Sequence, residues 1–129
     1  MIRLQNATYL VHDHDEALAF FVDGLGFVVR QDETFEGGWR RVVVGPEAGG
    51  TGLVLALCAD PEMLGHQAGD DVAFFLETDD FEQQHARMLA HGIRFREEPR
   101  HEAYGTVAIF EDPYGAPWDL IRPPRMSIG

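Results

Sequence analysis

The chain has 129 residues, a hydrophobic fraction of 45% and a formal net charge of −12. Its length and apolar content exclude a disordered protein and favour one domain of ordinary size, and no apolar run approaches the roughly 18 residues of a membrane span. The negative charge argues against nucleic acid and anionic membrane surfaces as partners, because both require clustered Lys and Arg.

The first half of the chain is predicted to form one strand, one helix and three further strands. The helix begins at Asp13, whose carboxylate can accept a bond from a free backbone N–H, and ends at Gly26, which can adopt the left-handed conformation. Apolar and β-branched residues predict strands at 7–11, 27–30, 39–44 and 53–57. Cys58, the only cysteine, ends the last strand and can form no internal disulfide. With no N-terminal secretory signal, this favours a reducing, cytoplasmic compartment.

The second half repeats this pattern after a linker. Residues 59–71, ADPEMLGHQAGDD, are rich in Gly, Pro and acids and predict a loop with at most one helical turn. Asp79 lies thirteen residues before Gly92, just as Asp13 lies thirteen residues before Gly26, so a second capped helix is expected. Strands are predicted at 74–78, 93–96, 105–110 and 118–121. DPYG at 112–115 has the Pro and Gly positions of a type I turn between the last two strands.

The duplicated pattern predicts an α+β fold with two tandem βαβββ modules. We expect a single domain, 1–129, with modules at about 6–58 and 72–122 joined by the linker 59–71. Because one helix can cover only one face of its sheet, the two modules are expected to form a rolled mixed sheet around a central cavity. A cavity of this kind is a natural place for a small ligand.

Two stretches resemble a known superfamily. VHDHDEALAFFVDGLGF (11–27) and FEDPYGAPWDL (110–120) are similar to sequences of the vicinal oxygen chelate superfamily, which includes glyoxalase I, extradiol dioxygenases and bleomycin-resistance proteins. The resemblance covers about residues 6–122 and implies the paired-module fold, although one scaffold hosts many functions. Bleomycin-resistance proteins sequester their ligand in pockets commonly built across a dimer. The resemblance therefore implies a small organic ligand and a homodimer.

The resemblance also implies a place for a metal ion. Metal-dependent members put one ligand on each of four strands, and the matching positions here are Asn6, Val54, Ala73 and Asp119. Only Asp119 is a good ligand, because the side chains of Val54 and Ala73 contain no donor atom. We therefore expect no cofactor. The alternative is a divalent ion in a noncanonical site that combines Asp119 with Glu77, His66 or a partner chain.

Three candidates for ligand contact lie in the second half. If Asp119 faces the cavity, Trp118 and Leu120 face the other way, because side chains alternate along a strand; the alternative is a carboxylate at a strand end in water. Phe75 and Glu77 share the strand face of Ala73, and Glu77 is a candidate general base or an exposed acid at the strand end.

Four further candidates complete the predicted site. Trp39 and Tyr104 occupy matching places just before a strand in the two halves and could line the cavity or fill the core. Arg41 shares the strand face of Trp39 and could hold a ligand carboxylate or phosphate, or pair with one of the many acids. His66 lies in the linker and could close over the ligand. Of the other histidines, His14 is predicted to be exposed after the helix cap, and His85 to pack in the core.

These features favour a small-molecule-binding protein that sequesters an antibiotic-like or cationic ligand. The alternative is a glyoxalase-like lyase or extradiol-type dioxygenase with a noncanonical metal site. A metal-free isomerase or lyase with Glu77 or Asp119 as its base is a third possibility. The feature that separates binding from metal catalysis is whether two or more further ligand-type side chains converge on Asp119.

Overall fold

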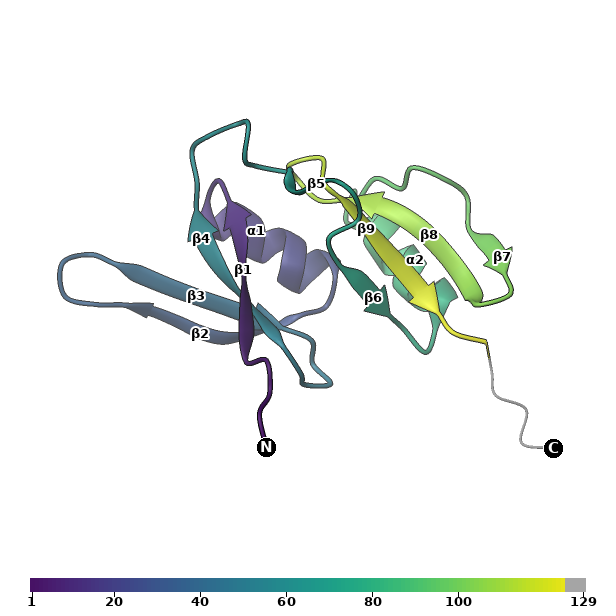
Figure 1. Cartoon of the computed structure of the whole chain (residues 1–129), viewed down its shortest axis with the longest axis horizontal. Helices are drawn as coiled ribbons and strands as arrows, with labels where there is room; N and C mark the ends of the chain where they lie inside the picture. The colour runs from purple at the N-terminus through teal and green to yellow at the C-terminus, as the bar shows by residue number, and fades with distance from the viewer. Residues whose placement is uncertain (125–129) are drawn as a thin grey trace. The chain divides into compact units, whose positions relative to one another are not determined.

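The computed structural model describes residues 1–124 of the chain (Figure 1). The protein forms two compact units, which divide between Gln67 and Ala68, inside the predicted linker. Each unit is a four-stranded sheet with a helix against one face, so the α+β fold with tandem βαβββ modules is confirmed. The described strands form two four-stranded mixed sheets, one in each unit. No helix among residues 1–124 is long and apolar enough to cross a membrane.

The first unit runs through one strand, a helical segment and three more strands. In chain order its elements are β1 (Asn6–Val11), α1 (His14–Leu18), η1 (Ala19–Gly24), β2 (Val28–Thr34), β3 (Arg40–Gly45) and β4 (Gly52–Leu57). The sheet order is β1-β4-β3-β2, with β1 parallel to β4 and the other pairs antiparallel. The N-cap at Asp13 is confirmed, since its Oδ1 accepts a bond from the Glu16 N–H at 2.9 Å.

Alternation along the strands places apolar residues against the helix. Tyr9 on β1 meets Phe21 edge-to-face with ring centroids 5.9 Å apart. The buried residues of this layer are Tyr9, Val11, Ala17, Phe21, Val42, Val44, Leu53 and Leu55. The helical segment widens into the π-helix η1, and Gly26 then follows with φ of 88°, as a left-handed terminating glycine requires. The intervening strand residues point to the opposite, helix-free face of the sheet.

The second unit repeats this arrangement. After β5 (Gln67–Asp70) come β6 (Phe75–Glu77), α2 (Phe81–Ala90), β7 (Arg100–Glu102), β8 (Gly105–Glu111) and β9 (Pro117–Arg122). The sheet order is β6-β9-β8-β7, with β6 parallel to β9. The core against α2 contains Phe81, Met88, Ala108, Phe110, Trp118 and Leu120.

The second helix begins one residue later than its predicted Asp79 cap. Asp80 is the N-cap, and its Oδ1 accepts from the Gln83 N–H at 3.0 Å. Starting the helix at Phe81 puts Phe81 and Met88, seven residues apart, on one buried face. Asp79 is left exposed.

The strand predicted at 93–96 is also wrong, because that segment forms only an isolated bridge between Phe95 and Phe110. The Oε2 atom of Glu97 accepts a bond from the Ile109 N–H at 2.9 Å, where a regular ladder would offer a backbone carbonyl. Pro99 follows and has no N–H to donate. The regular strand resumes only at β7.

The strand β5 lies inside the segment predicted to be a loop. The side chain of its first residue, Gln67, reaches the edge strand β1, where Oε1 accepts from the Leu10 N–H at 2.9 Å and Nε2 donates to the Thr8 carbonyl. A carboxamide carries the same kinds of donor and acceptor as a peptide group. The Gln67 side chain therefore hydrogen-bonds to backbone groups at the edge of the sheet, as a neighbouring strand would.

Candidate functional site

The helix-free face of the second sheet contains the acid on which the functional question depends. Asp119 on β9 lies opposite Phe75 on β6 and Ile109 on β8. Its neighbours Trp118 and Leu120 are 0% and 2% exposed and belong to the core against α2. Asp119 therefore points away from the helix, as strand alternation predicts.

Asp119 is incompletely hydrogen-bonded in this position. Its Oδ1 atom is buried and accepts no hydrogen bond from any residue the structure describes. Burial raises the pKa of the Asp119 carboxyl, while the positive charge of Arg100 opposes this shift and the carboxylate of Glu97 reinforces it. A buried acceptor without a donor is costly, so this oxygen is available to a donor supplied from outside the sheet.

The other acid of FEDPYGAPWDL has the opposite character. Asp112 is buried, and its Oδ1 accepts from the backbone N–H groups of Tyr114 at 2.9 Å and Ala116 at 3.0 Å, while Oδ2 accepts from the Trp118 indole at 3.1 Å. The Gly115 N–H donates to the Asp112 carbonyl at 3.0 Å, which confirms the turn at 112–115. Burial raises the pKa of Asp112 against the effect of these bonds. Asp112 therefore stabilises the turn, whereas Asp119 keeps an oxygen without a hydrogen-bond donor among the described residues.

Two other predicted site residues share the face of Asp119. Phe75 is paired with Asp119, and Glu77 is paired with Ile121, two residues further along β9. Phe75 is 66% exposed, an unusual state for a large apolar side chain in a sheet. The carboxylate thus has apolar neighbours at Phe75, Ile109 and Ile121.

Tyr104 lies at the turn before β8, as predicted, and is 55% exposed. It hydrogen-bonds to Arg100, whose guanidinium also pairs with Glu97 at 2.6 Å and Glu102 at 2.9 Å. These contacts raise the pKa of Arg100 above its ordinary value, with Glu97 as the main cause. Tyr104 is therefore tied to the charged residues around Asp119 through Arg100.

Trp39 and Arg41 lie in the first unit, where both line a cavity of about 640 Å³. This volume falls within the usual range for small-molecule pockets. Trp39 is 59% exposed and packs on Phe35 with ring centroids 5.1 Å apart. The Nε of Arg41 donates to the side-chain oxygen of Gln31 at 2.8 Å, so its partner is a neutral amide.

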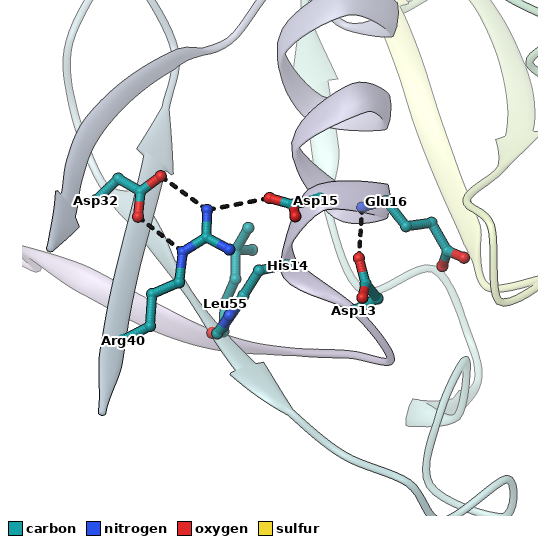
Figure 2. Close-up of polar contacts among 7 residues, drawn as sticks. All are labelled: Asp13, His14, Asp15, Glu16, Asp32, Arg40 and Leu55. Carbon is teal, nitrogen blue, oxygen red and sulfur yellow. Dashed lines mark hydrogen bonds and ion pairs between the residues drawn. The ribbon is translucent and has the colours of Figure 1, made fainter. Parts of the chain in front are cut away.

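The adjacent residue on β3 forms ion pairs on the other face. Figure 2 shows the guanidinium of Arg40 between the carboxylates of Asp32, at 2.8 Å, and Asp15, at 3.1 Å. The hydrogen bond from Arg40 lowers the pKa of Asp32. His14 is buried in the same region, and its Nε2 lies 2.9 Å from the Leu55 carbonyl. The prediction of an exposed His14 is wrong, because the first turn of α1 brings the imidazole onto β4.

The remaining histidine candidates are placed apart from these residues. His66 is exposed, and its backbone N–H donates to the Met63 carbonyl at 3.1 Å. It does not line the cavity at Trp39, which lies in the same unit. His85 packs between the rings of Phe81 and Phe95, with centroids 5.7 and 4.4 Å away, as predicted for a packed histidine.

Sequence reasoning missed Arg30. Its guanidinium donates to the carbonyls of Gly50 at 2.6 Å and Pro46 at 3.0 Å, across the loop between β3 and β4. In the second unit Arg96 similarly donates to Gly115 at 2.9 Å, across the loop between β8 and β9. The available signal was the Arg that ends both matching segments, FVVR at 27–30 and IRFR at 93–96, three residues after an apolar residue.

Comparison with known proteins bears on the family directly. Residues 3–120 match the Glyoxalase/Bleomycin resistance protein/Dioxygenase superfamily. An uncharacterised protein of Shewanella frigidimarina is 44% identical over 118 residues, which is 88% of this chain and 87% of the relative. The chain belongs to this superfamily.

Two solved structures of similar proteins cover nearly the whole superfamily domain. UcmS2 is 28% identical with a TM-score of 0.79, over 94% of this chain and 98% of UcmS2. TnmS3 from Streptomyces sp. CB03234, described as an antibiotic binding protein, is 28% identical with a TM-score of 0.77, over 96% of this chain and 98% of TnmS3.

The four positions that the resemblance assigns to metal ligands carry a poor donor set. Val54 lies on the helix-free face of β4, opposite Thr8, and its side chain offers no donor atom; Ala73 offers none either. Asn6 and Asp119 supply one amide and one carboxylate. Within residues 1–124, no three His, Cys, Asp or Glu side chains gather in a way that could hold a metal ion. These residues do not fit a four-ligand site.

Proposed function

We propose that this superfamily member binds a small organic ligand and holds it without transforming it, with Asp119 as the polar anchor. The observation that carries the proposal is the buried Oδ1 of Asp119, which lacks a hydrogen-bond donor and lies beside apolar side chains. A ligand ammonium or N–H group placed against this oxygen would remove an unfavourable unpaired acceptor. Apolar surroundings with one or two oriented polar groups are typical of ligand pockets.

Three further observations support an antibiotic-like or cationic ligand. TnmS3, a similar protein over nearly its whole length, is described as binding an antibiotic. Phe75, paired with Asp119 in the second unit, is a large aromatic side chain held 66% exposed and available to stack on a planar or cationic group. The net charge of −12 favours a positively charged partner over a negative one at long range.

The direct test is calorimetric titration of the full chain with bleomycin and with a panel of planar aromatic amines. We expect at least one of these compounds to bind in saturable fashion, and Asp119→Asn to weaken its binding by about tenfold, since a hydrogen bond to a charged group contributes about 1.5–3 kcal/mol. Glu98→Gln is the matched control, because it removes one negative charge from an exposed position of the same unit. No binding across the panel, or equal binding by wild type and Asp119→Asn, would contradict the proposal.

Metal-dependent catalysis is the rival function, and the same unpaired carboxylate is the observation that favours it. An oxygen without a donor can equally coordinate a cation. Titration with Mn²⁺, Fe²⁺, Ni²⁺ and Zn²⁺ distinguishes the two. About one ion per chain, lost in Asp119→Ala, would favour a lyase or dioxygenase. Absence of binding by all four ions would favour a ligand-binding protein.

A homodimer, a cytoplasmic location and the absence of a nucleic-acid partner remain predictions from the sequence. Sedimentation equilibrium over a range of protein concentrations tests the first. If the ligand is shared across a dimer, its affinity will rise with protein concentration through the dissociation range of the dimer.

A further inference from the structure

One cavity of the first unit gathers positive charge. Its volume is about 810 Å³, and three of its lining residues are Arg3, Arg30 and Arg41. The chain has 22 acidic and only 10 basic residues, yet no Asp or Glu lines this cavity. Among the described residues, none of these three arginines forms an ion pair, since the ion pairs belong to Arg40, Arg96 and Arg100.

Arg30 is held in place without being neutralised. Its terminal nitrogens donate to the backbone carbonyls of Gly50 and Pro46, which orient the guanidinium but carry no formal charge. The group lies over Gly45 and Gly52, where a Cβ atom on either residue would collide with it or crowd it. The two glycines thus leave a recess in the hairpin for the arginine, which is positioned before any ligand arrives.

Arg41 likewise has a neutral partner. Its Nε donates to Gln31 at 2.8 Å, and Gln31 in turn donates to Glu33 at 3.2 Å. Glu33 lies opposite Arg41 in the sheet but is linked to it only through the amide of Gln31. The preceding residue, Arg40, bonds two carboxylates directly. Adjacent arginines on β3 therefore differ, and only the one facing the cavity keeps its terminal donors for an outside anion.

We propose that this cavity binds the carboxylate or phosphate group of an organic anion. Arg30 and Arg41 supply planar donors that match the oxygens of either group, and Arg3 adds positive charge from the N-terminal segment. The cavity volume suits a small organic molecule rather than a bare ion. Acidic side chains that lie more than about 8 Å from the cavity are largely screened from it at physiological salt. The three arginines belong to the first unit and Asp119 to the second.

Calorimetric titration of the full chain with phenyl phosphate and benzoate tests the proposal, with benzyl alcohol as the uncharged probe. We expect saturable binding of one or both anions, and their relative affinities show which group the site prefers. Arg41→Gln should weaken binding by about tenfold or more, because it removes a charged donor. Arg94→Gln is the matched control, because Arg94 is an exposed arginine of the second unit and its replacement removes the same charge. The affinity of this variant for the anions should differ from that of wild type by less than twofold.

A second variant displaces the guanidinium of Arg30 without removing its charge. Gly45→Ala places a methyl group where the guanidinium of Arg30 lies, and the flexible side chain is the group that must move. We expect anion affinity to fall severalfold while the circular dichroism spectrum is retained. Asp119→Asn should leave anion affinity unchanged, which separates this site from the ligand site of the second unit. The proposal is overturned if wild type shows no saturable anion binding, if benzyl alcohol binds equally well, or if Arg94→Gln loses as much affinity as Arg41→Gln.

Discussion

Asp112 accepts the indole N–H of Trp118 at 3.1 Å, and this bond ties the turn between β8 and β9 to the core of the second unit. Trp118 is fully buried, and the same carboxylate also accepts two backbone N–H groups of the turn. Asp119, the next residue after the tryptophan, has no such partner on its buried oxygen. Of the two acids in this short stretch, Asp112 is therefore bonded to the turn and the core, whereas Asp119 has a buried oxygen without a partner among the described residues.

Replacement of Asp112 should destabilise the fold. Asp112→Ala leaves the Tyr114 and Ala116 N–H groups and the buried indole N–H without acceptors, at a cost of about 1–3 kcal/mol for each group that water cannot reach. We expect the free energy of unfolding in urea to fall by about 3 kcal/mol. Glu98→Gln, at an exposed position, should change it little. An Asp112→Ala variant as stable as wild type would mean that water replaces the carboxylate.

Asp119 should make stability depend on pH in a defined direction. Because burial raises the pKa of this carboxyl above its ordinary 3.8, the folded protein holds the proton more tightly than the unfolded chain. The stabilisation is complete below the unfolded pKa and is lost as pH rises through the raised, folded value. Comparing wild type with Asp119→Asn by urea unfolding between pH 4 and pH 7, we expect wild type to lose stability relative to the variant as pH rises. A constant difference would contradict the assignment.

The bonds from Gln67 to β1 should protect the edge of the first sheet. Gln67→Ala removes the acceptor of the Leu10 N–H and the donor to the Thr8 carbonyl. We expect faster hydrogen exchange at Leu10 and a loss of about 1–2 kcal/mol of stability, as two exposed hydrogen bonds would give. Gln83→Ala, on the exposed surface of α2, is the control. Unchanged exchange at Leu10 would show that β1 needs no partner there.

Gly105 should tolerate no side chain. Its φ is 134°, and a Cβ atom would collide with the backbone carbonyl of Arg122 on β9. We expect Gly105→Ala to lower the free energy of unfolding by about 3 kcal/mol or more, since strain and a backbone clash act together. Gly37→Ala, at φ of 92° with open space around it, isolates the backbone strain and should cost about 1–2 kcal/mol. Equal losses in the two variants would mean that β9 moves aside.

Much of the fold could be predicted because the two halves of the chain carry the same sequence pattern, so that each half supports the assignment of elements in the other. Strand alternation placed Asp119 on the helix-free face and Trp118 in the core, and the helix starting at Asp13 was found from its cap. The segment at 93–96 misled because its apolar pattern is that of a strand. The competing feature was Glu97, whose carboxylate takes the place of a backbone carbonyl.

The chemistry of the candidate site was less accessible. The sequence shows which face Asp119 occupies, but whether its oxygens find donors depends on residues distant along the chain. His14 was misassigned because its acceptor, the carbonyl of Leu55, lies 41 residues away. Arg30 was missed because its role depends on the absence of side chains at Gly45 and Gly52, and glycines in strands are not read as part of an arginine site.

The arginines that end FVVR and IRFR have a consequence for how such modules can change. Arg30 and Arg96 each donate hydrogen bonds to main-chain carbonyl oxygens of a hairpin loop. These oxygens are present whatever residues the loop contains. The two loops already differ in length, GPEAGG against DPYG, under the same kind of clasp. Loop sequence can therefore vary while the paired strands stay in register. A duplicated scaffold with this property can acquire new binding loops without rebuilding its sheets.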